Sequence, residues 1–86
     1  MKEFKFVIRD ELGIHARPAG LLAKLAKEYK DTAVTVTKSG NTVKASQLMK
    51  LMSLGVKHGD EVTVAAEGPD EEAAIEKLNA FFQENL

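Results

Sequence analysis

One short segment combines residue types that could do chemistry, and it centres on a histidine. It reads Gly13-Ile14-His15-Ala16-Arg17-Pro18-Ala19. A neutral imidazole nitrogen is a competent nucleophile near pH 7. Arg17 adds a fixed cation whose guanidinium can bind two phosphate oxygens at once. The pair favours the capture of a phosphoryl group on His15.

The helical pattern that begins at His15 supports the same chemistry. Apolar residues recur at helical spacing from His15 to about Lys30, and Pro18 falls in the first turn, where its missing N–H costs nothing. The amides of Ala16 and Arg17 would have no partner within the helix, and the helix dipole adds partial positive charge. Helix starts of this kind bind phosphate. The sequence therefore predicts a phosphate site at His15, Ala16, Arg17 and Pro18.

Plainer interpretations compete with this one. A lone histidine is more often a capping or surface residue than a nucleophile, and a lone arginine is most often a solvated charge. No carboxylate is placed by the sequence to activate water, which favours reversible capture over hydrolysis. A phosphate-binding Gly-rich loop is absent, so we expect no ATP binding. We expect no cofactor and no metal site, and we expect His58 to be an exposed loop residue without chemistry.

Composition narrows the class of protein. The 86 residues carry a net charge of −1 and no cysteine. We expect one domain spanning residues 1–86 and no nucleic-acid partner driven by bulk charge. No stretch is apolar enough for a signal peptide or a membrane span. These features predict a cytoplasmic protein without membrane insertion.

The elements that must position His15 follow from two alternating periods. Apolar and polar residues alternate in four segments, which predicts four strands: Phe4 to Ile8, Ala33 to Thr37, Thr42 to Lys44 and Glu61 to Ala66. Helical patterns begin at His15, at Gln47 and at Asp70, and Lys38 to Asn41 reads as a hairpin turn. The order is βαββαβα with one apolar face per element, which predicts one sheet with helices on a single face. The other face of the sheet is expected to be exposed to solvent and to carry Lys5, Arg9, Thr35, Thr37 and Thr63.

A protein that captures a phosphoryl group reversibly must meet and release at least two partners, which requires a modest exposed patch. Gly20 leaves a spot free of side chain beside His15, and Lys24 and Lys27 extend a basic stripe. In the short second helix we assign Leu48, Leu51 and Leu54 to the core, Met49 to the surface and Met52 to either. The alternatives are that all five are core and that the lysines are merely solvated. The candidate partner surface comprises Gly20, Lys24, Lys27, Leu48, Met49 and Met52.

The histidine segment resembles the active-site motif of HPr, the phosphocarrier family of the bacterial sugar phosphotransferase system. Met52-Ser53-Leu54-Gly55-Val56 and Ala66-Glu67-Gly68 resemble further segments of that family, and the similarity covers essentially the whole chain. The resemblance implies an α+β open-faced β-sandwich, with a four-stranded antiparallel sheet and three helices on one face. It also implies that His15 accepts a phosphoryl group at Nδ1 from enzyme I and passes it to enzyme IIA domains. Arg17 and the Ala16 backbone would steady the phosphate. Such a protein is a covalent substrate of its partner enzymes rather than an enzyme.

The chain departs from the family pattern at the start of the second helix. Many relatives carry a regulatory serine there that a kinase phosphorylates, but Gln47 occupies that place and Ser46 comes one residue early. We expect Ser46 to be a structural N-cap, with regulatory phosphorylation as the alternative. The competing function is a regulatory module that controls a kinase or transcription factor. An RNA-binding domain is disfavoured because the open sheet face lacks aromatic residues. A monomer is the expected state.

Overall fold

Four strands pair into one antiparallel sheet. They are β1 (Lys2–Val7), β2 (Ala33–Lys38), β3 (Asn41–Lys44) and β4 (Glu61–Glu67). Their order across the sheet is β1-β4-β2-β3, and every neighbouring pair is antiparallel. The computed structural model describes all residues from 1 to 86.

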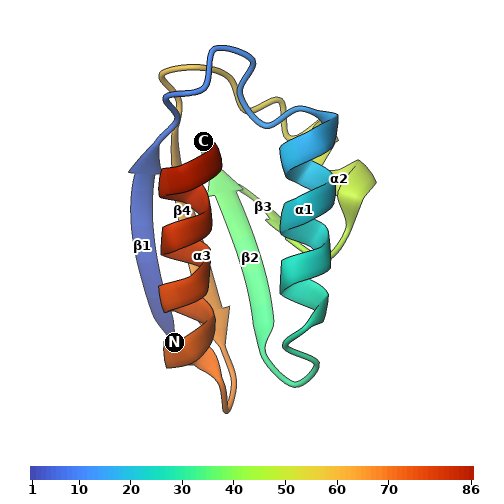
Figure 1. Cartoon of the computed structure of the whole chain (residues 1–86), viewed down its shortest axis with the longest axis vertical. Helices are drawn as coiled ribbons and strands as arrows, with labels where there is room; N and C mark the ends of the chain where they lie inside the picture. Colours follow the sequence, from blue (N-terminus) through green and yellow to red (C-terminus); the bar gives the residue numbers. More distant parts are fainter.

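Three helices cover one face of this sheet. They are α1 (Ala16–Lys27), α2 (Leu48–Ser53) and α3 (Glu71–Asn85), and Figure 1 shows α1 and α3 running along the sheet. The predicted βαββαβα order and open-faced sandwich are confirmed. Helix α1 ends at Lys27 rather than near Lys30, because the Glu28 and Tyr29 amides turn back to the carbonyls of Leu25 and Ala26 and close the last turn.

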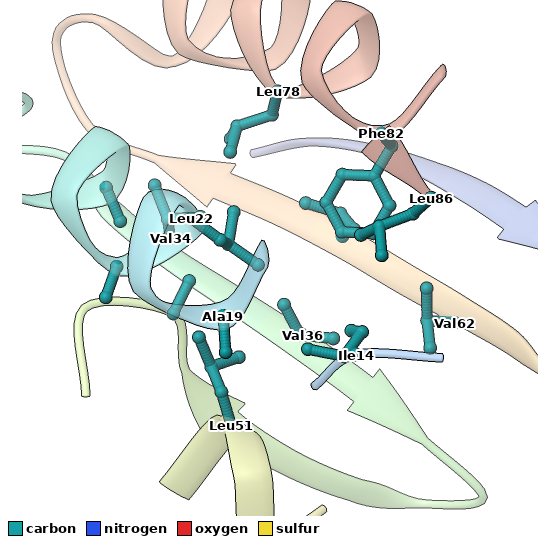
Figure 2. Close-up of a cluster of buried hydrophobic side chains, with 14 of the residues drawn as sticks. Ile14, Ala19, Leu22, Val34, Val36, Leu51, Val62, Leu78, Phe82 and Leu86 are labelled. Atoms are coloured by element: carbon teal, nitrogen blue, oxygen red, sulfur yellow. The ribbon is translucent and has the colours of Figure 1, made fainter. Parts of the chain in front are cut away.

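The core lies between the sheet and the helices. Phe4, Phe6 and Ile8 point inward from the first strand and its end, as their alternation predicted. The buried Phe82 ring of α3 meets Phe4 and Phe6 edge-on, with centroids 5.7 and 5.5 Å away. Figure 2 shows side chains from α1, α2 and α3 meeting those of the sheet. Fully burying one large apolar side chain contributes about 1.5–3 kcal/mol, so this layer fixes α1 on the sheet.

The far sheet face matches the sequence except at Arg9, and the hairpin matches it too. Lys5 is exposed, and the three predicted threonines, Thr35, Thr37 and Thr63, are half-buried. Arg9 lies on the helix side instead: its guanidinium lies over the Phe6 ring, 5.3 Å from the centroid, and donates to the Gln83 carbonyl of α3 at 2.7 Å. The hairpin between β2 and β3 turns at Ser39 and Gly40, whose φ angles are 51° and 82°. Two successive positive φ values are typical of the primed turns that match strand twist.

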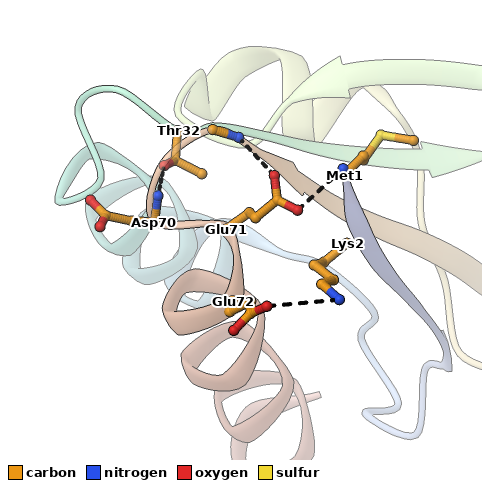
Figure 3. A network of polar contacts seen from close by, with 7 residues as sticks. Met1, Lys2, Thr32, Asp70, Glu71 and Glu72 are labelled. Carbon is orange, nitrogen blue, oxygen red and sulfur yellow. Dashed lines mark hydrogen bonds and ion pairs between the residues drawn. The ribbon is translucent and has the colours of Figure 1, made fainter.

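Two turns pack together at the end of the sheet away from His15. Gly68 has φ of 151°, and a Cβ there would lie 2.5 Å from the Asp31 carbonyl oxygen, so no other residue fits. The buried Thr32 hydroxyl accepts from the Asp70 amide at 3.0 Å (Figure 3). The Gly68 amide and the Met1 amino group hold the pKa of Glu71 below its ordinary value. These contacts fix the start of α3.

Helix α2 differs from the prediction at its start. Gln47, not Ser46, occupies the N-cap position, and its side chain forms no capping hydrogen bond. Leu48 is 39% exposed, so its assignment to the core is wrong, whereas Leu51 is fully buried and Leu54 half-buried. A six-residue helix turns less than twice, and it presents only Leu51 squarely to the core.

Candidate functional site

The loop before α1 is fixed by a glycine. Gly13 has φ of 68°, and a Cβ there would lie 2.2 Å from the Val56 carbonyl oxygen. That same oxygen accepts a hydrogen bond from the Ile14 amide at 3.1 Å. The loops before α1 and before β4 therefore lie side by side, as Figure 1 shows. Only glycine allows this close approach at a positive φ.

His15 lies at the N-cap of α1. Its backbone is extended, with φ of −100° and ψ of −174°, and its side chain forms no capping bond. The ring is 37% exposed. Its carbonyl accepts from the Ala19 amide at 2.9 Å, whereas the Ala16 and Arg17 amides donate to no protein acceptor. Free amides and an accessible imidazole thus meet at one helix end, which suits an incoming anion.

A shallow pocket of about 300 Å³ opens beside the ring. Helix α1 contributes Arg17, Pro18 and Leu21 to its wall, and α3 contributes Glu84 and Asn85. The exposed Arg17 guanidinium forms no ion pair, so it is free to meet an anion. Three of the predicted site residues, His15, Arg17 and Pro18, line this pocket, and Ala16 has its free amide at the same helix start.

Asp10 also lines this pocket, and sequence reasoning missed it. Its Oδ1 lies 4.0 Å from His15 Nε2. Leu12 donates its amide to the same Oδ1 at 2.8 Å, so the carboxylate closes a turn that folds back toward the ring. An aspartate three residues before a turn glycine was the available signal.

The predicted partner residues lie on the surface of α1 and α2. Met49 is 77% exposed and Met52 42% exposed. Lys24 and Lys27 are exposed, and nothing lies within 4 Å of where a Gly20 Cβ would be. Leu48, which the sequence analysis assigned to the core and also included in this surface, is exposed and lies on the surface.

Leu21 is a further exposed residue of α1 that the sequence did not single out, and it lies on the side of Glu84 and Asn85 of α3. It is 44% exposed and lines the His15 pocket, although the helical pattern placed it beside the buried face. We call the three exposed apolar residues of α2, Leu48, Met49 and Met52, the apolar patch.

A lysine and an aspartate brace the loop that carries Val56. Lys38 Nζ lies 2.9 Å from Asp60 Oδ2 and donates to the Gly55 carbonyl at 2.7 Å. Asp60 Oδ2 accepts from the Lys57 amide at 2.8 Å. The Lys38 ammonium and then the Lys57 amide hold the pKa of Asp60 below its ordinary value. The brace supports the backbone against which Gly13 packs.

Two other predicted residues lie apart from the His15 pocket. Ser46 is half-buried and lines a separate pocket of about 460 Å³ with Lys27, Lys30 and Lys44. His58 is exposed, and its Nδ1 lies 3.1 Å from the Arg9 carbonyl oxygen.

None of the three helices is long and apolar enough to span a membrane.

Comparison with known proteins gives one consistent result. The family model described as "PTS HPr component phosphorylation site" matches residues 2–84. The phosphocarrier protein HPr of Mycoplasma genitalium is 42% identical over 85 residues, which cover 99% of this chain and 97% of that protein. The HPr-like protein Crh of Bacillus subtilis is 42% identical over 86 residues, the full length of both chains.

Solved structures give the same result. The crystal structure of HPr-C-His from Thermoanaerobacter tengcongensis superposes with a TM-score of 0.91 at 39% identity. The match covers 98% of this chain and 93% of that one. The likeness therefore extends over the whole fold and includes the segment that carries His15.

Proposed function

The chain belongs to the HPr family of phosphocarrier proteins of the phosphotransferase system, and from that membership we propose that His15 is its phosphoryl acceptor. The phosphoryl group arrives from enzyme I and leaves to enzyme IIA domains. In this role the chain is a covalent substrate of its partners rather than an enzyme. It acts in the cytoplasm as a monomer, without a cofactor.

One observation carries the proposal: the accessible His15 ring lies at a helix start with two free amides. In the transfer step the Nδ1 lone pair forms a bond to phosphorus while the bond between phosphorus and the donor breaks and its electron pair stays with the donor. The Ala16 and Arg17 amides and the Arg17 guanidinium are available to the phosphoryl oxygens. The amides belong to the helix backbone, so they are oriented before the phosphoryl group arrives.

The apolar patch and the neighbouring lysines are the proposed docking surface. The patch is small and its two methionines are flexible, which suits a surface that fits several partners and releases them. Lys24 and Lys27 lie beside it on α1 and would speed the approach of acidic partners.

The second candidate is a regulatory module, favoured by the likeness to the HPr-like protein Crh. A purely regulatory relative need not keep a nucleophile at the start of α1. This chain has a histidine at that place and free amides beside it. These features favour the carrier.

The test is phosphorylation in a defined mixture. The protein is incubated with enzyme I, Mg²⁺ and phosphoenolpyruvate, and its intact mass is measured. We expect a single phosphate adduct that is lost in acid and absent from His15→Ala. A protein that stays unmodified, while an HPr of known activity is phosphorylated in the same mixture, would favour the regulatory module instead.

A further inference from the structure

Asp10 provides the carboxylate that lies beside the His15 ring. Its Oδ1 is 4.0 Å from Nε2, with side chains 32% and 37% exposed, respectively. Both groups are therefore partly withdrawn from water, in the pocket that Arg17 also lines. A charge at this distance and depth acts on the ring more strongly than it would in open solvent.

The loop backbone, not the ring, sets the position of this carboxylate. Asp10 Oδ1 accepts from the Leu12 amide at 2.8 Å, and the Asp10 carbonyl accepts from the Gly13 amide at 3.0 Å. The Asp10 amide donates to the Leu86 carbonyl at 2.9 Å. Three hydrogen bonds thus hold the residue, so its carboxylate faces the ring whether or not the ring is charged.

The two ring nitrogens have different surroundings. Nε2 faces Asp10, whereas Nδ1 has no hydrogen-bond partner in the protein. A neutral imidazole carries one proton, on either nitrogen, and an ionised carboxylate only accepts hydrogen bonds. A proton on Nε2 is attracted to Asp10, and a lone pair there is repelled. We infer that Asp10 is a positioning residue that keeps neutral His15 in its Nε2–H form and so leaves the Nδ1 lone pair free.

This inference rests on the proposed function for its purpose and deepens it. When Nδ1 bonds to phosphorus, the Nε2 proton stays and the ring gains a positive charge, which Asp10 offsets from 4.0 Å. The other charged groups at the pocket are Arg17, on the first turn of α1, and Glu84 of α3. Arg17 is a cation and cannot accept the Nε2 proton, and Glu84 forms no ion pair with the ring.

The experiment reads the ring directly, without any partner protein. The ¹⁵N-labelled chain is titrated by NMR, and the shifts of the two ring nitrogens at alkaline pH give the ratio of Nε2–H to Nδ1–H forms. Asp10→Asn removes the charge and keeps an oxygen for the Leu12 amide. We expect this variant to lower the ratio about threefold, the effect of a partly exposed charge interaction. Glu84→Gln removes the other pocket carboxylate and is the matched control, with an unchanged ratio expected.

Three outcomes would overturn the inference. The first is a wild-type ring that is mainly in the Nδ1–H form, and the second is a ratio in Asp10→Asn equal to that of the wild type. The third is a change of the ratio in Glu84→Gln as large as in Asp10→Asn, which would show a general effect of pocket charge. A phosphorylation assay of the same variants separates this inference from the carrier role. If the wild-type chain accepts no phosphate but the ratio still depends on Asp10, the proposed function fails and the tautomer assignment stands.

Discussion

The contact between Gly13 and the Val56 carbonyl gives a quantitative prediction for Gly13→Ala. A φ of 68° costs an ordinary residue about 1–2 kcal/mol. The new Cβ would lie 2.2 Å from Val56 O, and moving that backbone costs a further ~1–3 kcal/mol. The Ile14 hydrogen bond to the same oxygen is worth ~1 kcal/mol and is lost if the loops separate. Together these costs amount to roughly 3–6 kcal/mol of unfolding free energy.

Gly40→Ala is the matched control. Gly40 has φ of 82°, but a Cβ there meets nothing within 4 Å, so only the conformational cost applies. The two variants should differ by about 2–4 kcal/mol, which is a gap of at least ~8 °C in melting temperature for a domain of this size. Circular dichroism melts of the wild type and both variants measure it. Equal melting temperatures for the two variants would refute the claim that packing against Val56 holds the loop of His15.

Three further predictions follow from the site and its supports. Arg17→Ala should slow phosphoryl transfer at least ~10-fold, because the guanidinium no longer meets the phosphoryl oxygens. The melting temperature should not change, because this guanidinium is exposed and forms no ion pair in the folded protein. An unchanged rate would remove Arg17 from the mechanism. Met49 is 77% exposed, so Met49→Lys should weaken the binding of enzyme I, measured by calorimetry, and leave the protein folded. Leu51 is fully buried, so Leu51→Ala should lower the unfolding free energy by ~2–5 kcal/mol. Loss of folding in Met49→Lys would contradict the assignment of Met49 to the surface. Because the pKa of Asp60 is lowered in the folded state, the contribution of Asp60 to stability is complete above its unfolded-state pKa of about 4 and is lost as the pH falls below that value. The unfolding free energy of Asp60→Asn, measured with urea, should therefore fall less over that pH range than that of the wild type. Parallel curves of unfolding free energy against pH for the two proteins would contradict the brace.

The spacing of apolar residues predicted the strands and helices because each of them packs against the core with one face only. Val34 and Val36 alternate with threonines, and both are buried in the sheet as that pattern requires. The helix start at His15 could be located for a similar reason, and free amides at Ala16 and Arg17 were expected because every helix start has them. Local signals were sufficient for these features.

Contacts between distant segments were beyond the sequence. The turn that carries Asp10 closes through local hydrogen bonds, but it also packs on the Val56 carbonyl at Gly13 and donates the Asp10 amide to the Leu86 carbonyl. No local pattern encodes these two distant contacts. The strand order β1-β4-β2-β3 is also set by non-local pairing. In α2 the helix start was misplaced by one residue, and that shift moved the N-cap from Ser46 to Gln47.

We propose that His15 receives the phosphoryl group at the free amides of α1. Amide NMR spectra of the chain before and after phosphorylation by enzyme I and phosphoenolpyruvate test it most directly. We predict that phosphorus is bonded to Nδ1 of His15 and that the Ala16 and Arg17 amide signals shift the most of the backbone amides. A phosphoryl group on another residue, or Ala16 and Arg17 signals that do not move, would contradict the account.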